Sequence, residues 1–188
     1  MPAYRLSPAC KDYLWGGHRR LREDFGVESS LDPLAEAWVL SCHPDGPSRL
    51  ADSPFAGMTL PAYLEREGGL GTHCRSFQDF PLLIKLIDAE RDLSIQVHPS
   101  DEYALTHEGQ YGKTEMWVVL DAAPGASLYY GVEREVSRED FARHIQAGTL
   151  PEILHKVPVR RGDVFFIPAG TLHAIGAGLV IAEIQQNS

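Results

Sequence analysis

The sequence predicts a mainly all-β protein, an antiparallel β-sandwich or barrel with a few short helices. Its thirteen prolines and seventeen glycines are scattered through 188 residues. Breaks at such short intervals favour many short strands over long helices. After residue 80, a small helical segment interrupts a series of short apolar segments, which is typical of antiparallel β folds. We therefore expect a barrel from about residue 80 onward, with residues 1–60 adding strands and loops.

The strands are expected where apolar residues cluster between turn signals. Before residue 80 the clearest segment is 35–40. After residue 80 the expected strands cover 82–87, 93–98, 115–120, 126–130, 163–167 and 178–184. We expect one domain over residues 1–188, in which residues 1–79 pack on a core formed by residues 80–188.

Helices are expected at three places. The first covers residues 59–67, with Thr59 at its cap position and two glycines at its end. The second runs to residue 147 from a start that resembles a capping box at Ser137. A short third helix is expected at 151–155.

Composition excludes several functional classes. The formal net charge of −9 argues against nucleic-acid binding, which calls for a basic face, although a few local cations can still hold one small anion. No apolar run approaches the roughly 20 residues needed to cross a bilayer, and the N-terminus lacks a signal-peptide core. Three widely spaced cysteines indicate reduced thiols. We expect a cytoplasmic protein with no membrane or nucleic-acid partner.

Polar residues alternate with apolar ones between Leu93 and Pro99. If this segment is a strand, Ser94, Gln96 and His98 share one face, because alternate side chains point the same way. Such a face is often an ordinary solvated surface, so the segment alone does not predict a site.

The segment that begins at Lys113 adds a carboxylate. Glu115, Trp117 and Val119 share a face of the expected strand, and burial of the two apolar residues draws Glu115 inside. A buried carboxylate is costly unless it is paired, hydrogen-bonded or bound to a metal. A Lys113–Glu115 ion pair would satisfy it, but it would leave Gln96 and His98 unexplained.

His173 completes a possible ligand set. It follows a strand and a Pro/Gly turn, which can present it at the rim of a barrel. Together with Gln96, His98 and Glu115, it offers two imidazoles, a carboxylate and an amide oxygen. These donors suit a divalent transition metal, with zinc as the first candidate.

The same segments carry a family resemblance. Gly162, Pro168, Gly170 and His173 match the second motif of the cupins, although Ala177 replaces its usual asparagine. The segments QVHP, GKTEMW and PAGTLHAIG, together with WGG, EAW and IQQNS, resemble the short bacterial form of type I mannose-6-phosphate isomerase, in register along essentially the whole chain. The resemblance implies a cupin-type antiparallel jelly-roll barrel.

The resemblance also implies site residues. One zinc ion per chain would be bound by Gln96, His98, Glu115 and His173, with the neutral amide of Gln96 as the weakest ligand. Ser94 and Lys113 match positions near the phosphate or a sugar hydroxyl, and Glu183 matches an acid that faces the site.

The implied reaction interconverts mannose 6-phosphate and fructose 6-phosphate through a cis-enediol. The catalytic candidates are Lys113 and Glu183. Either of them, or a metal-activated water, could remove the C2 proton, and Lys113 could instead steady the developing enediolate.

Two other functions stay open. The family's members continue past the QQNS segment with a catalytic arginine and a second β domain, whereas this sequence stops at Ser188. We therefore expect weak turnover of this chain, and one alternative is a non-catalytic or weakly active metal-containing cupin that binds a sugar phosphate. The other is an Fe(II)-dependent oxygenase, because two histidines and a carboxylate also bind iron. Gln96, Ser94 and Lys113 count against the oxygenase.

Overall fold

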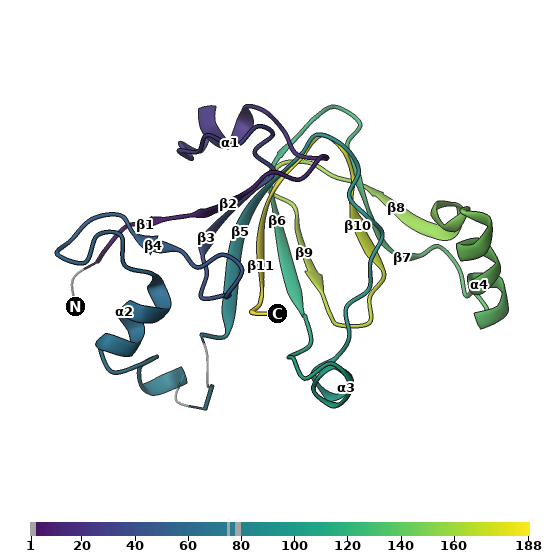
Figure 1. Cartoon of the computed structure of the whole chain (residues 1–188). Coiled ribbons are helices and arrows are strands. Elements are labelled where there is room, and N and C mark those ends of the chain that lie inside the picture. Colours follow the sequence, from purple (N-terminus) through teal and green to yellow (C-terminus); the bar gives the residue numbers. More distant parts are fainter. Residues whose placement is uncertain (1–2, 75, 78–79) are drawn as a thin grey trace.

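The computed structural model describes residues 3–74, 76–77 and 80–188. Within these residues the strands form three antiparallel sheets (Figure 1). The largest has the order β2 (Ala9–Lys11), β3 (Glu36–Leu40), β5 (Leu82–Ala89), β11 (Leu179–Gln186), β6 (Glu115–Ala122) and β9 (Val164–Ile167). The second has the order β10 (His173–Ile175), β7 (Ser127–Val132) and β8 (Leu154–Pro158), and the third pairs β1 (Leu6–Ser7) with β4 (Arg49–Leu50).

The main core lies between the six-stranded and the three-stranded sheets. Alternate residues of β5, β6 and β11 point inward and meet residues of β7 and β10. The buried residues of this cluster are Ile87, Ala89, Trp117, Val119, Ala126, Leu128, Ile167, Ile175, Leu179 and Ile181. Two antiparallel sheets packed on one core are the arrangement of a β-sandwich or jelly roll.

A smaller apolar cluster covers part of the opposite face of the large sheet. Here Leu21, on the short helix α1 (Arg20–Glu23), packs with Val27, Leu34, Ala37 and Val180. The N-terminal residues thus cover one end of this sheet as well as supplying its strands β2 and β3.

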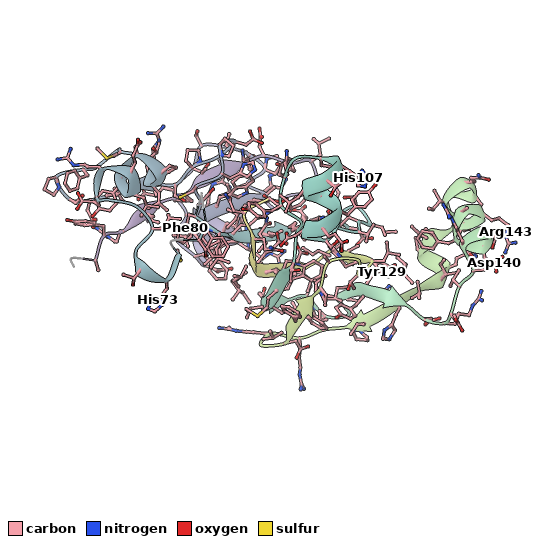
Figure 2. All side chains as sticks on the ribbon, turned by 90° about the horizontal axis from the view of Figure 1, so that it is seen from below. His73, Phe80, His107, Tyr129, Asp140 and Arg143 are labelled. Carbon is pink, nitrogen blue, oxygen red and sulfur yellow. The ribbon has the colours of Figure 1, made fainter. Side chains whose placement is uncertain are left out.

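Helices lie at the periphery of the sheets. They are α2 (Leu60–Arg66), α3 (Asp101–His107), α4 (Arg138–Ala147) and two 3-10 helices, η1 (Thr72–Cys74) and η2 (Leu150–Ile153). Helix α4 lies far from the large sheet, with Asp140 and Arg143 on it (Figures 1 and 2). Every helix in the described part of the chain is too short or too polar to cross a membrane.

Most predicted elements are confirmed. The mainly β, antiparallel class is correct, and β3, β5, β6, β7, β9 and β11 lie within a few residues of the expected strands. Helix α4 begins where the Ser137 hydroxyl accepts a hydrogen bond from the Asp140 amide at 3.1 Å, and it ends at Gly148, whose φ of +69° is left-handed. Helix α2 also follows Thr59, but the Thr59 side chain makes no capping hydrogen bond.

One prediction was wrong, and another was correct only in part. Residues 93–98 form no strand, because the one bridge in this segment is an isolated one between Gln96 and His173. The backbones of Leu93 and His98 add one hydrogen bond each, with Ile175 and Gly170, and Val97 is 54% exposed. The expected helix at 151–155 is the 3-10 helix η2 followed directly by β8. The sequence interpretation also missed α1, α3, η1 and the short strands β1, β2, β4, β8 and β10.

Candidate metal centre and adjoining pocket

Strand register brings one row of functional side chains together on the inner face of the large sheet. Glu183 on β11 lies directly opposite Lys85 on β5 and Trp117 on β6. Lys85 in turn lies opposite Trp38 on β3. Directly paired residues on one face contact each other, so four strands contribute to a single row.

Glu115 lies in the adjacent row, at the first position of β6. Its Cα partners are Gln185 on β11 and Ile167 on β9. Trp117 and Val119 are buried, and Glu115 is only 1% exposed. The expectation that the apolar residues of this strand draw the carboxylate inside is therefore confirmed.

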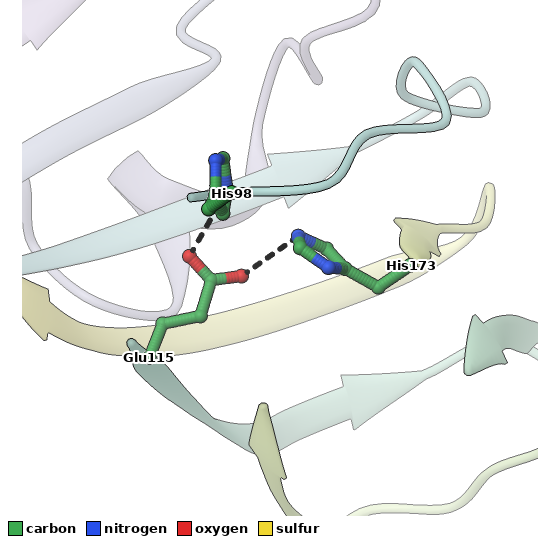
Figure 3. A group of neighbouring side chains, drawn as sticks. All are labelled: His98, Glu115 and His173. Carbon is green, nitrogen blue, oxygen red and sulfur yellow. Dashed lines mark ion pairs between the residues drawn. The ribbon is translucent and has the colours of Figure 1, made fainter. Parts of the chain in front are cut away.

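Two histidines from other segments converge on this carboxylate (Figure 3). His98 Nε2 lies 3.6 Å from Glu115 Oε2, and His173 Nε2 lies 3.2 Å from Glu115 Oε1. His173 opens β10, and its backbone forms the bridge to Gln96, which fixes the 93–98 segment beside it. The candidate ligand atoms all lie within 4.8 Å of one another.

Nε2 of both histidines and both oxygens of Glu115 are buried and make no hydrogen bond of normal geometry among the described residues, although Glu115 Oε2 is ion-paired with Lys113. Nδ1 of His173 lies 2.8 Å from the Thr171 carbonyl oxygen, to which it can donate, and this leaves the lone pair of Nε2 directed at Glu115. Buried polar atoms without partners are uncommon, and two imidazoles with one carboxylate are a typical donor set for a transition metal. The three residues therefore fit a divalent metal ion.

The protonation states also suit a metal site. Burial, aided by the charge of Lys113, lowers the pKa of His98 to about 4, so its imidazole is neutral at pH 7. Burial raises the pKa of Glu115, but the contact with His173 and the charge of Lys113 outweigh it, and the net pKa is lowered. Metal ligands bind as neutral imidazole and ionised carboxylate.

Lys113 connects this centre with the row around Glu183. Its Nζ lies 2.7 Å from Glu115 Oε2 and 3.4 Å from Glu183 Oε1. The Lys113–Glu115 ion pair considered as an alternative is thus present, and both histidines still converge on the same carboxylate. Glu183 Oε2 accepts a hydrogen bond from the Trp117 indole at 2.9 Å.

A pocket of about 210 Å³ adjoins the centre. Ser94, Gln96, Lys113 and Glu183 line it, so every predicted site residue lies either in this pocket or in the His–Glu–His cluster. The backbone of Gln96 pairs with His173, but its role as a ligand stays a prediction.

Sequence reasoning missed part of this pocket. Lys85, Glu36 and Trp38 line it together with the stacked rings of Tyr13 and Trp15, whose centroids are 5.4 Å apart. Lys85 could have been identified as the one charged residue in the apolar segment 82–87. Its Nζ lies 3.2 Å from Glu183 Oε1 and 3.8 Å from Glu36 Oε2. Burial lowers its pKa, but these two carboxylates outweigh burial and raise it.

Comparison with known proteins identifies relatives along the whole chain. Residues 3–120 match the family model for the catalytic domain of type I phosphomannose isomerase. Mannose-6-phosphate isomerase of Streptococcus mutans is 44% identical over 176 residues, which are 93% of this chain and 54% of that protein. ManA of Bacillus subtilis is 39% identical over 184 residues, which are 97% of this chain and 57% of the relative.

Solved structures agree with this result. The crystal structure of mannose 6-phosphate isomerase from Bacillus subtilis superposes with a TM-score of 0.88 at 37% identity. The match covers 98% of this chain and 58% of that one, so the chain spans little more than half the length of these relatives. The family model covers more than half of the chain, and the chain therefore belongs to the type I phosphomannose isomerase family.

Proposed function

We propose that this chain is a zinc-dependent aldose–ketose isomerase that interconverts mannose 6-phosphate and fructose 6-phosphate through a cis-enediol. The observation that carries the proposal is the convergence of His98, Glu115 and His173 beside a pocket that contains two lysines. The named activity of the relatives supports the same substrate.

The proposed metal is one Zn²⁺ per chain, with His98, Glu115 and His173 as ligands and Gln96 as the fourth. The donor set supports this choice, because a zinc site with catalytic function usually combines histidines and a carboxylate with an exchangeable position. When bound, the ion would act as a Lewis acid that polarises the substrate carbonyl.

Lys113 and Glu183 are the proposed catalytic residues. Lys113 Nζ lies within 3.4 Å of two carboxylates. It would donate a hydrogen bond to the oxygen that becomes negative as the enediolate forms. Glu183 has both oxygens occupied, by lysines on one side and by the Trp117 indole on the other. By these contacts Glu183 would hold Lys113 in place, and its carboxylate would also take the C2 proton.

Substrate binding is assigned to the pocket that Ser94, Lys85 and Lys113 line. Ser94 would donate its hydroxyl to the phosphate or a sugar oxygen, and Lys113 and Lys85 would supply positive charge. Lys85 is added here to the residues expected from the sequence, because its side chain lines the same pocket as Ser94.

A coupled assay tests the proposal. The purified chain, supplied with zinc, should convert mannose 6-phosphate to fructose 6-phosphate, and chelation should abolish the conversion. Lys113→Met should lower turnover by about 10²–10³-fold if the lysine stabilises developing charge. Conversion that survives complete metal removal, or no conversion by the zinc-loaded chain, would contradict the proposal.

A further inference from the structure

The pocket and the adjoining centre carry more buried negative charge than positive charge. Glu36, Glu115 and Glu183 are 6%, 1% and 3% exposed. Among the described residues that line the pocket or form the cluster, the lysines and arginines are Lys85 and Lys113 alone. These side chains therefore comprise three carboxyl groups and two amino groups, so that the acidic groups outnumber the basic ones.

In the metal-free chain, both ammonium groups are already paired with carboxylates. Lys113 Nζ lies between Glu115 and Glu183, at 2.7 and 3.4 Å. Lys85 Nζ lies between Glu183 and Glu36, at 3.2 and 3.8 Å. A phosphate monoester carries roughly −1.5 to −2 at pH 7, so it would compete with carboxylates already in place, in surroundings that screen charge less than water does.

We propose that the pocket binds a phosphorylated sugar at least tenfold more tightly after the divalent ion is bound than before, and that the carboxylate of Glu36 weakens binding to the metal-free pocket. The inference rests on the proposed function and adds a sequence of binding to it. A divalent ion adds two positive charges beside these carboxylates. It would also take Glu115 as a ligand, which leaves Glu183 as the remaining carboxylate in contact with Lys113.

Glu36 is suited to this role because it is not among the candidate metal ligands. It accepts a hydrogen bond from the Trp38 indole at 2.6 Å and lies at the Lys85 end of the row. Its charge therefore acts on the anion more than on the metal ion. By linkage, a sugar phosphate must tighten metal binding by the same factor by which the metal tightens sugar-phosphate binding.

Tryptophan fluorescence gives a test that does not depend on turnover, because Trp15 and Trp38 line the pocket and Trp117 contacts Glu183. Mannose 6-phosphate is titrated into the metal-free and the zinc-loaded chain. We expect at least tenfold tighter binding to the loaded form, within the range of common coupling factors. Zinc should also raise the affinity for mannose 6-phosphate by a larger factor than the affinity for uncharged mannose.

The variant Glu36→Gln tests the effect of the Glu36 charge on sugar-phosphate binding. The amide keeps an oxygen for the Trp38 indole and removes one of the three carboxylates. Mannose 6-phosphate should bind the metal-free variant several-fold more tightly than the metal-free wild type. Glu133→Gln is the matched control, since Glu133 is exposed beyond the end of β7. It should leave the affinity of the metal-free chain for mannose 6-phosphate unchanged.

The outcomes separate the inference from the proposed function. Equal affinity of the metal-free and zinc-loaded wild type for mannose 6-phosphate would overturn the inference alone. An equal effect of zinc on mannose and mannose 6-phosphate would do the same, and this comparison needs no variant. Absence of mannose 6-phosphate binding to either form would overturn both the inference and the proposed function.

Discussion

The two ends of the site differ in whether their polar groups are satisfied. At the metal end, Nε2 of His98 and of His173 and both oxygens of Glu115 lack a normal hydrogen bond among the described residues. At the other end, Glu183 and Glu36 each accept an indole hydrogen bond, and each lies within 4 Å of Lys85. At the metal end, Lys113 pairs with Glu115 Oε2 but Nε2 of both histidines is left without a hydrogen bond, whereas the other end is complete within the folded chain. Substitutions at the two ends should therefore separate ligand binding from folding.

The largest loss of stability is expected at the complete end. Glu183→Gln removes the carboxylate shared by Lys85 and Lys113 and leaves two buried ammonium groups with less compensation. Breaking a buried ion pair from one side costs about 3 kcal/mol or more. Urea unfolding of the metal-free chain measures the effect, with Glu133→Gln as a control expected within about 0.5 kcal/mol of wild type. A loss of stability no larger than that of the control would show that the Glu183 carboxylate does not stabilise the fold.

At the metal end, a substitution should lower zinc affinity and leave the stability of the metal-free chain almost unchanged. His98→Gln removes a ligand whose Nε2 has no partner in the metal-free chain, so metal-free stability at pH 8 should stay within about 1 kcal/mol of wild type. Zinc affinity, measured by chelator competition, should fall by more than about 100-fold. His155→Gln, at an exposed position on β8, is the matched control. Unchanged zinc affinity in His98→Gln would remove His98 from the ligand set.

The pH dependence of the stability of the metal-free chain should also come from the metal end, through His98. The pKa of His98 is about 4 in the folded chain against an ordinary value of 6.5. Between these values the unfolded chain binds a proton that the folded chain does not, so stability is full above pH 6.5 and falls as pH drops towards 4. The loss is on the order of 2–3 kcal/mol, and His98→Gln should lack it. An equal acid-induced loss in the variant would assign the effect to other groups.

The smallest effect is expected far from both ends. Ser137→Ala removes the hydroxyl that caps α4, and stability should fall by about 1 kcal/mol. Zinc affinity should stay unchanged, because α4 lies far from the metal centre (Figure 1). A parallel fall in zinc affinity would mean that any loss of stability disturbs the site, which would weaken the comparison between its two ends.

The metal end was the more predictable of the two from sequence. Glu115 was expected inside because Trp117 and Val119 share its strand face, and that burial is observed. His98 and Gln96 were grouped by strand parity, and their side chains do face the site although residues 93–98 form no strand. The polar side chains stay directed inward because Gln96 pairs with His173 at one bridge.

The pocket end could not be derived from local pattern. Glu36, Trp38 and Lys85 belong to strands separated by about forty residues, and only the β3–β5 register places Trp38 opposite Lys85. Lys85 is unusual in its apolar segment, but Glu36 and Trp38 are ordinary strand residues within theirs, and no one segment shows that the three meet. Short strands such as β1 and β4, of two residues each, are likewise formed by long-range pairing, which leaves little periodicity to detect.

The central claim is that His98, Glu115 and His173 together hold one divalent metal ion. The most direct test is elemental analysis of the chain purified without added metal, before and after equilibration with zinc, in parallel with Glu115→Gln. The account predicts about one zinc ion per wild-type chain and a large loss of bound zinc in the variant. Iron in place of zinc in the wild type would favour the oxygenase alternative. Equal zinc content in the wild type and the variant, or no bound metal in the wild type, would contradict the claim.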